Sequence, residues 1–309
     1  MGRYVARRLL QMIPVFIGTT LLIFLMVNVL PGDPVAALWG DKPPDPAQMA
    51  IIRKDLGLDL PLWQQYLNYL GGLLQGDFGT TIAGNRPVLD QMTDAFPVSI
   101  RLGLMAFTFE LVLGLFFGVL AGVKRGKVID TGVTVFTLMV ISIPVFVLGL
   151  VSQQVFGTQL GWVSPNVKDS MDMAQLVLPA IVLGSLSLAY VARLTRTSIA
   201  ENARADYMRT AVAKGLPQRR IVSMHLLRNS LIPVVTYLGT DIGALMAGAV
   251  VTEGIFNVQG VGQLLFEALA RREGSIIVGI VTVFVLIYLL ANLLVDLLYA
   301  VLDPRIRYA

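Results

Sequence analysis

Long apolar runs without a charged residue divide this chain. Four such runs contain no Asp, Glu, Lys or Arg, and two more contain a single carboxylate each. A helix needs about 20 apolar residues to cross a hydrocarbon core about 30 Å thick. The pattern therefore predicts an all-α, polytopic membrane protein with six transmembrane helices. We place them near residues 9–30, 99–123, 131–156, 175–193, 230–252 and 276–301.

Composition and loop charges refine this prediction. Of the 309 residues, 14% are charged, whereas a soluble chain carries about 25%, and the mean hydropathy is +0.72. Eight Lys or Arg residues lie in residues 193–228, from the end of the fourth span to the start of the fifth, whereas residues 31–98 hold eight acids and four bases. Because loops rich in Lys and Arg stay in the cytoplasm, we expect both termini inside and residues 31–98 outside. This asymmetry accounts for the pI of about 9.4 without a nucleic-acid partner.

The first span leads into a long external segment. Basic residues precede this span as in a signal peptide, but Leu30-Pro-Gly-Asp-Pro34 follows it instead of a small-x-small cleavage site, so we expect an uncleaved helix. Further on, Pro43-Pro-Asp-Pro46 predicts a loop, and apolar residues at helical spacing predict a helix over 55–74. That helix could cap the membrane surface or dock an external partner. We expect residues 1–98 and 99–309 to form two domains.

Two sequence features bear on how the spans pack. Gly114, Gly118 and Gly122 form a ridge of small residues in the second span, which favours close approach of another helix. Pro144 lies inside the third span and should kink it, because proline lacks the N–H that a helix needs. Both features are common in membrane bundles, so they indicate packing and no particular function.

Few residue types suited to catalysis or metal binding are present. The chain has no Cys, and His225 is its one histidine, which excludes disulfides, Cys/His zinc sites and a thiol nucleophile. Asp77-Phe-Gly79 matches a kinase tripeptide but has no Gly-rich phosphate loop with it, and Gly126-Lys127 lacks the other P-loop residues. We therefore expect no catalytic residue, no metal site and no cofactor bound by this chain itself.

A basic, helix-prone island separates the fourth and fifth spans. Apolar residues recur every fourth position from Ile199 to Ala211, which predicts a helix with one apolar face. Gly215-Leu-Pro217 interrupts this helix, and a second short helix follows. Such a pair of helices could lie on anionic lipid, held by its arginines, or could offer a docking surface to another protein. Composition and spacing leave both interpretations open.

The island resembles the coupling loop of ABC importer permeases, most closely that of the dipeptide/oligopeptide/nickel branch. That branch reads D-Y-x-R-T-A-x-A-K-G-L, followed by H-x-L-R-N-x-L-I-P. Arg209-Thr210 replaces the Glu-Ala of the general superfamily pattern, and this departure is itself typical of the peptide branch. The matching residues are Asp206, Tyr207, Arg209, Thr210, Ala211, Ala213, Lys214, Gly215 and Leu216, then His225, Leu227, Arg228, Asn229, Leu231, Ile232 and Pro233.

Other short motifs extend the resemblance to nearly the whole chain. The Gly-Asp-Pro motif after the first span is typical of the B-type subunit, which carries a long first external loop. Each motif alone is weak, but together they are specific. They are Leu30-Pro-Gly-Asp-Pro34, Gly76-Asp-Phe-Gly79, Arg86-Pro-Val, Thr252-Glu253-x-Ile-Phe256, Gly260-Val-Gly262 and Leu302-Asp-Pro-Arg-Ile-Arg-Tyr308.

The resemblance implies a type I ABC importer permease in a bacterial plasma (inner) membrane. Its implied partners are a second, C-type permease, two cytoplasmic ABC ATPases that bind ATP and Mg, and an external substrate-binding protein that delivers peptide. Loop 194–229 would couple this chain to the ATPases. The implied coupling residues are Asp206, Tyr207, Arg209, Thr210, Ala211, Ala213, Lys214, Gly215, Leu216, Arg219, His225 and Arg228.

Two carboxylates remain inside the apolar spans. Glu110 lies near the middle of the second span and Asp241 near the middle of the fifth. A charge at the bilayer centre costs at least ~2.5 kcal/mol on insertion scales, so each carboxylate should face a partner or a cavity. Either residue could form a structural hydrogen bond between helices, or could line the substrate path and recognise a peptide amino group.

Alternative functions stay open from the sequence. A nickel chelate or a haem-like molecule could replace peptide as the cargo of the same architecture. A self-contained secondary transporter or channel would need its own coupling-ion site and inverted repeats, and we find no such repeat. An intramembrane enzyme would need converging catalytic groups, whereas the predicted spans contain scattered carboxylates without His or Cys.

Overall fold

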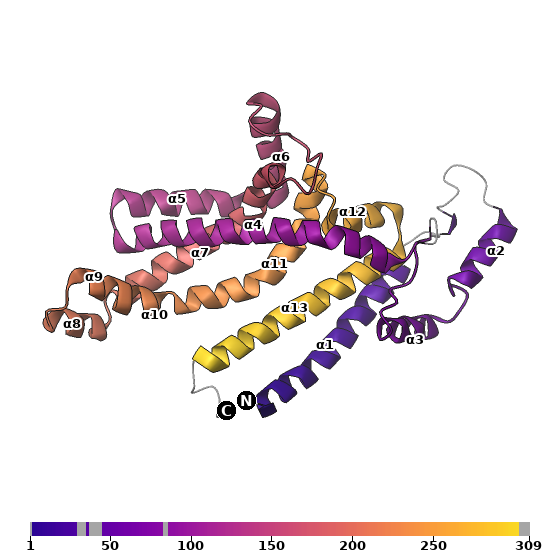
Figure 1. Ribbon diagram of the computed structural model, residues 1–309, viewed down its shortest axis with the longest axis horizontal. Coiled ribbons are helices and arrows are strands. Elements are labelled where there is room, and N and C mark those ends of the chain that lie inside the picture. The colour runs from indigo at the N-terminus through magenta and orange to yellow at the C-terminus, as the bar shows by residue number, and fades with distance from the viewer. Residues whose placement is uncertain (1, 30–34, 37–44, 83–85, 303–309) are drawn as a thin grey trace. The chain divides into compact units, whose positions relative to one another are not determined.

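Figure 1 shows a computed structural model of the chain, which is built from helices. The structure describes residues 2–29, 35–36, 45–82 and 86–302. Within these residues the all-α prediction is confirmed, and the strand-like structure amounts to one isolated bridge between Thr80 and Pro87. The motifs expected at 30–34 and 303–308 lie outside the described residues.

The chain forms two compact units. One contains the residues up to Ser99 together with those from Gln259 onward, and the other contains Ile100–Val258. These units are groups of residues in mutual contact, and they do not define where functional domains end. The division into 1–98 and 99–309 therefore stays a prediction.

The first unit is built on two long apolar helices that pack against each other. The Tyr66 hydroxyl lies 2.9 Å from the Thr20 hydroxyl, and the Tyr69 hydroxyl lies 2.6 Å from the Thr282 hydroxyl. Burial raises the pKa of Tyr69 to about 12, so this phenol stays neutral at physiological pH. The helices of this unit are α1 (Gly2–Val29), α2 (Pro46–Asp55), α3 (Leu62–Leu73), the first part of α4 (Val88–Val123), α12 (Val261–Arg271) and α13 (Gly274–Leu302), with α1 against α13.

The external segment contains two helices where the sequence predicts one over 55–74. α2 begins at Pro46, whose ring suits the first helical turn, and the Asp45 carboxylate accepts a hydrogen bond from the Ala47 N–H at 2.9 Å. Pro46 thus starts a helix instead of continuing the predicted loop, whose residues 43 and 44 lie outside the described residues. Gly57, with a φ of +65°, then turns the chain, so α3 is a separate helix.

The second unit is organised around α7, which packs against α5, α6, α10 and α11. A chain of short helices connects α7 to α11 and forms the island recognised in the sequence. The elements are α5 (Val128–Ser142), α6 (Val145–Ser152), the π-helix η2 (Gln153–Gln159), α7 (Met173–Asn202), α8 (Asp206–Ala213), α9 (Gln218–Arg220), the π-helix η3 (Ile221–Leu227), α10 (Arg228–Ser230) and α11 (Ile232–Phe256).

The predicted glycine ridge brings α4 against α7. A Cβ atom at Gly118 would lie 2.5 Å from the Cβ of Thr195 and 2.7 Å from the carbonyl oxygen of Ala192. Such distances leave no room for a side chain, so the glycines set the separation of the two helices. The contacts advance by four residues along both helices: Gly114 faces Val191, Gly118 faces Thr195, and Gly122 faces Ile199.

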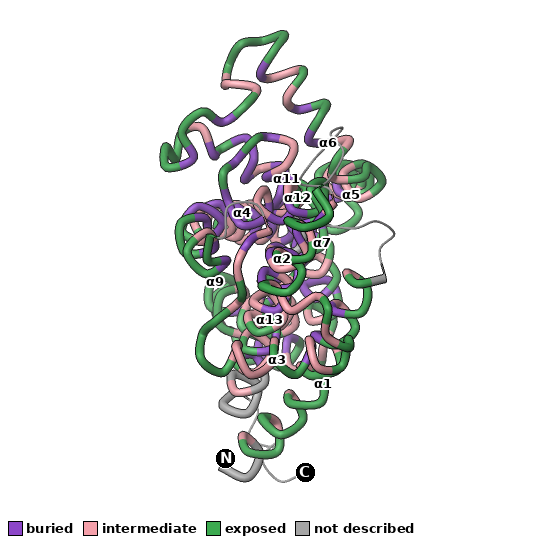
Figure 2. Tube along the Cα trace, turned by 90° about the vertical axis from the view of Figure 1, so that its right-hand side faces the viewer, coloured by how far each residue is buried: buried purple, intermediate pink, exposed green. Residues whose placement is uncertain are grey.

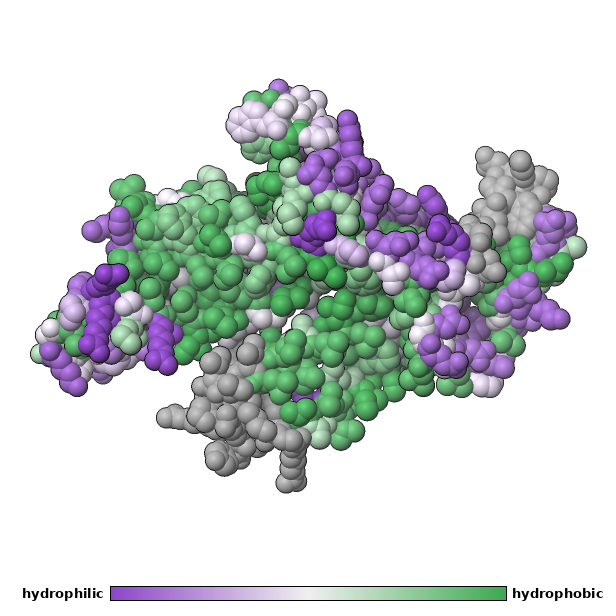
Figure 3. Space-filling view, viewed as in Figure 1, coloured by the Kyte–Doolittle hydropathy of each residue, from purple (hydrophilic) through white to green (hydrophobic). Residues whose placement is uncertain are grey.

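In the part of the chain that the structure describes, four helices are long and apolar enough to span a membrane, or up to six if each of two bent pairs counts as one span. Pro144 does more than kink the third span, because the chain turns by 100° between α5 and α6. The other bent pair, with an angle of 42°, joins Gln218–Ser230 to the start of α11. Figure 3 shows hydrophobic residues over the long helices and hydrophilic residues gathered around α8 and α9.

Candidate functional site

The coupling loop predicted over 194–229 begins as part of a membrane helix. α7 continues to Asn202, past the predicted end of the fourth span near residue 193, and α8 follows after a short turn. Gly215 has a φ of +71°, a backbone conformation that glycine adopts without strain. Pro217 then precedes α9. The predicted break between two short helices is therefore present at Gly215-Leu-Pro217.

Apolar side chains fold the loop onto the end of α7. Met208 and Ala211 of α8 pack with Ile199 of α7, and this cluster also includes Ile221 and Leu226 of η3. All five are buried within the structure. Burial of apolar surface stabilises the loop by roughly 25 cal/mol per Å². The loop is therefore an ordered substructure with its own small core.

Hydrogen bonds reinforce this packing. The Tyr207 hydroxyl donates to Asn202 Oδ1 at 2.7 Å, and the Asn202 side-chain amide donates to the Ser198 carbonyl oxygen at 2.9 Å. The Ser230 hydroxyl also donates to the Ser198 carbonyl oxygen, at 3.4 Å. Ser198 thus receives hydrogen bonds from both ends of the loop, and α7 holds the loop in a fixed orientation.

The predicted coupling residues gather on this one substructure but differ in exposure. Ala211 is buried in the loop core, and Tyr207 and Leu216 pack against it, so these three help to hold the loop together. His225 is half-buried. The remaining predicted residues are exposed: Asp206, Arg209, Thr210, Ala213, Lys214, Gly215, Arg219 and Arg228. Their contact with a partner protein stays a prediction.

The surface of the loop combines positive charge with an apolar patch. Val212 is 61% exposed, and the side chain of Arg209 is 81% exposed. A cavity of about 560 Å³ lies between α8, η3 and the ends of α4 and α7. Apolar residues dominate its lining, among them Val123, Val212 and Val222. The loop therefore offers an apolar recess whose lining includes the basic side chain of Arg209.

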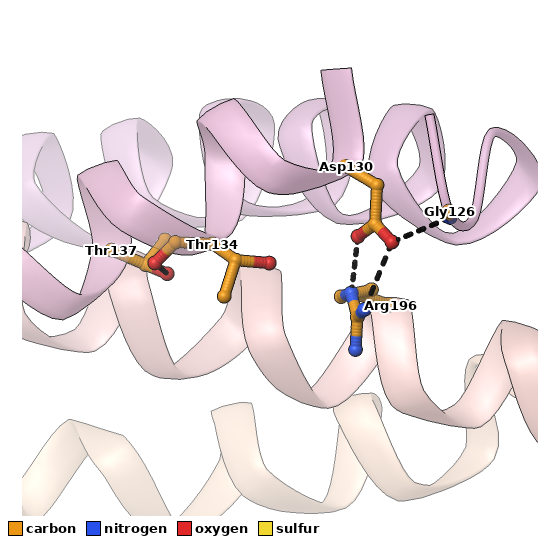
Figure 4. A network of polar contacts seen from close by, with 5 residues as sticks. All are labelled: Gly126, Asp130, Thr134, Thr137 and Arg196. Carbon is orange, nitrogen blue, oxygen red and sulfur yellow. Dashed lines mark hydrogen bonds and ion pairs between the residues drawn. The ribbon is translucent and has the colours of Figure 1, made fainter. Parts of the chain in front are cut away.

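An ion pair that sequence reasoning missed fixes α7 to α5 close to the loop. Figure 4 shows the guanidinium group of Arg196 in α7 bonded to both carboxylate oxygens of Asp130 in α5. Arg196 Nη2 lies 2.9 Å from Asp130 Oδ2, which also accepts the Gly126 N–H at 2.9 Å. Asp130 is 4% exposed. The signal in the sequence was an acid at the edge of an apolar run, directly after a basic turn.

The two membrane carboxylates, which the sequence places in different spans, meet in the structure. Glu110 of α4 is 0% exposed and Asp241 of α11 is 4% exposed, and the two carboxyls lie close enough for their charges to interact. The Ser187 hydroxyl of α7 donates to Asp241 Oδ1 at 3.0 Å. The three residues join three helices of the second unit. We call Glu110 and Asp241 the carboxyl pair.

Comparison with known proteins covers almost the whole chain. The family model described as "Binding-protein-dependent transport system inner membrane component" matches residues 114–308, and the model of its N-terminal part matches residues 1–103. The chain belongs to this family. Relatives that match this chain over nearly its full length are also named permease proteins.

Three curated relatives are named for the transport of different peptides. The di/tripeptide transport system permease protein DppB of Pseudomonas aeruginosa (strain UCBPP-PA14) is 39% identical over 99% of this chain and 98% of the relative. The dipeptide transport system permease protein DppB of Escherichia coli (strain K12) is 39% identical over 100% and 99%. The glutathione transport system permease protein GsiC of the same strain is 38% identical over 100% of both chains.

Solved structures share the fold at low sequence identity. A chain of the MetNI methionine ABC transporter, in an inward-facing conformation, matches with a TM-score of 0.56 and 17% identity, over 69% of this chain and 96% of that chain. An amino acid ABC transporter crystallised with histidines matches with a TM-score of 0.54 and 15% identity, over 68% and 92%. The chain thus has the type I ABC permease fold, and it is a permease subunit of an ABC transporter.

Proposed function

We propose that this permease subunit imports short peptides across a bacterial plasma membrane. The support is that three full-length relatives at 38–39% identity are named for dipeptide, di/tripeptide and glutathione transport. All three cargoes are small peptides, so a short peptide backbone is the chemistry they share. Nickel chelates and haem-like molecules are weaker candidates, because none of these three relatives is named for them.

In this proposal the chain works with separate energy-supplying subunits. Two cytoplasmic ATPases bind ATP and Mg and dock on the coupling loop, a C-type permease forms the other half of the path, and an external protein delivers the peptide. The chain itself is non-catalytic and binds no cofactor. Both of its termini and the coupling loop lie in the cytoplasm, as the basic loops favour. The exposed Arg209, Lys214 and Arg219 suit acidic groups on an ATPase.

The continuity of α7 is the observation that carries this mechanism. α7 is one helix from Met173 to Asn202, so the base of the coupling loop and the middle of the membrane belong to the same rigid element. A displacement of the loop by the ATPases moves α7, and α7 is tied to α4 by the glycine ridge and to α5 by Arg196. Conformational coupling requires that the two states of the transporter contact the ATPases differently.

Replacing Gly215 by valine tests the proposed coupling surface. A Cβ atom at Gly215 would meet no atom within 4 Å, but the φ of +71° is strained for any residue with a side chain. We expect Gly215→Val to abolish peptide transport and weaken ATPase co-purification, while the amount of protein in the membrane stays near normal. Transport would be measured as uptake of labelled dipeptide, tripeptide and glutathione by the complete importer.

Gly161→Val is the matched control. Gly161 also has a positive φ, +62°, and open space around its Cβ position, but it lies outside the coupling loop. Normal transport by Gly161→Val together with loss in Gly215→Val assigns the effect to the loop. If Gly215→Val transports normally with a full complement of ATPases, the loop is a lipid-bound amphipathic segment and the proposed docking of the ATPases on it is wrong.

A further inference from the structure

Three of the four side-chain oxygens in the carboxyl pair lack a hydrogen-bond donor among the described residues. Within the described residues, neither side-chain oxygen of Glu110 has a hydrogen-bond partner, and Asp241 Oδ2 has none either. Asp241 Oδ1 accepts a hydrogen bond from the Ser187 hydroxyl at 3.0 Å, the one hydrogen bond to the pair among the described residues. Buried polar groups in proteins are nearly always hydrogen-bonded, so three unpartnered carboxyl oxygens in one place call for an explanation.

The groups around the carboxyl pair that the structure describes are hydroxyls and aromatic rings. Besides the hydroxyl of Ser187, the group that interacts with both carboxyls is the phenol of Tyr237 in α11, whose ring contacts the ring of Tyr190 in α7. The neighbouring α6 has no ionisable residue, and the acid of α5, Asp130, is bound to Arg196. Among the described residues, no Lys, Arg or His forms an ion pair with either carboxyl.

Two adjacent anions are unfavourable at this position. Burial of a charge without a counter-ion is unfavourable, and like charges that share a site suppress the ionisation of one of them. A single proton between the carboxyls removes the repulsion and provides the missing donor. An O–H···O hydrogen bond to a charged carboxylate is also short and strong.

We propose that Glu110 and Asp241 form a proton-binding site in which one proton bridges a Glu110 oxygen and Asp241 Oδ2 and joins α4 to α11. The proton comes from water, and no bond other than the O–H bond forms or breaks. This site does not depend on the identity of the cargo. A conformation that separates α4 from α11 breaks the bridge, so proton binding favours the arrangement seen here.

The pH dependence of stability tests the site. If the folded pair holds one shared proton at neutral pH, where the carboxyls of the unfolded chain have released theirs, stability falls as pH rises, by about tenfold in the unfolding equilibrium per pH unit. The double variant Glu110→Gln/Asp241→Asn keeps an amide hydrogen bond but has nothing to titrate. We expect the apparent melting temperature of the complete importer in nanodiscs to fall with pH in the parent and to lose this slope in the variant.

A control and a second measurement keep the proposal falsifiable. Glu267→Gln removes a part-exposed carboxylate of α12, paired with Arg271 at 3.2 Å, and should leave the parent slope unchanged. If the double variant does not assemble, infrared spectra of the parent should still show the C=O band of a protonated carboxyl that shifts in D₂O. An unchanged slope in an assembled double variant, or the absence of that band from the parent, would refute the shared proton.

The remaining alternative is that the missing cation is the ammonium group of a peptide. Dialanine would then raise the melting temperature of the parent at every pH, and the double variant would lose this effect. That result would assign the carboxyl pair to the substrate path and overturn the proton-binding site. It would leave the proposed import of peptides intact, so the two proposals fail separately.

Discussion

The helices α7 and α1 are both apolar enough to cross a membrane, yet they have different surroundings. In α7, 67% of the most apolar window is buried within the structure, whereas in α1 the share is 11%. Figure 2 shows α1 as a largely exposed helix, with Leu10 at 66% and Met26 at 63% exposure. Because lipid tails are as apolar as leucine, a hydrophobic run does not reveal whether lipid or protein covers it.

The contacts of the two helices differ in kind as well as in extent. α7 is held by a glycine ridge and a buried ion pair, and it continues into the coupling loop. α1 is held by packing against α13 and by the hydroxyl of Tyr66, which contacts Thr20 and donates to the Ile17 carbonyl oxygen at 3.0 Å. A helix that transmits movement needs rigid contacts, whereas a peripheral helix needs to be held only loosely. Three substitutions test this comparison.

The largest effect should come from the glycine ridge. Gly118→Val places a branched side chain where Thr195 and the Ala192 carbonyl already lie, so α4 and α7 must separate along their whole contact. We expect almost no folded protein in the membrane, measured by size-exclusion profile after extraction. Gly18→Val in α1 is the matched control, because a Cβ atom there meets nothing within 4 Å. Equal loss in both variants would mean that α7 is no more tightly packed than α1.

The next effect should come from the ion pair. Arg196→Ala leaves the carboxylate of Asp130, 4% exposed, without its partner, which costs about 3 kcal/mol for a buried pair. We expect a lower melting temperature and less transport per ATP hydrolysed, since α7 and α5 are no longer joined. Arg271→Ala removes an exposed i,i+4 pair with Glu267 and should cost at most about 0.5 kcal/mol. Similar losses in the two variants would contradict the role assigned to Asp130.

The smallest effect should come from α1. Tyr66→Phe removes the hydroxyl that joins α3 to α1 and costs about 1 kcal/mol, the usual net value of one hydrogen bond. We expect a small decrease in melting temperature and normal transport. Tyr288→Phe, at a half-exposed position of α13, should have no measurable effect. A complete loss of transport in Tyr66→Phe would show that α1 shares the coupling function of α7.

The coupling loop shows how far motifs alone can lead. The helix break at Gly215-Leu-Pro217 followed from residue type, because it depends on local backbone preferences. The single helix predicted from Ile199 to Ala211 was wrong, since α7 ends at Asn202 and α8 begins at Asp206. The starts of helices were harder to place. Pro46 was expected in a loop but begins α2, because proline suits the first turn of a helix and Asp45 caps it. The 100° turn at Pro144 exceeded the expected kink, since a proline fixes the break but the neighbouring helices decide the angle.

Other features needed the folded chain. The partners of Asp130 and Glu110 lie 66 and 131 residues away in the sequence, at Arg196 and Asp241, and no local pattern links them. The sequence indicated that each membrane carboxylate needs a partner, because burial of a charge is costly. It did not indicate that the partner of one is the other.

The sequence by itself determined the all-α membrane class, the place of the coupling loop and the small-residue ridge, because periodicity, charge and glycine spacing act over a few residues. The tertiary structure decided which apolar helix is internal and which carboxylates meet. These depend on how helices pack side by side, and packing brings together residues whose distance along the chain carries no signal. For this reason the loop could be recognised from its residues, whereas the carboxyl pair became visible only when α4, α7 and α11 were placed against one another.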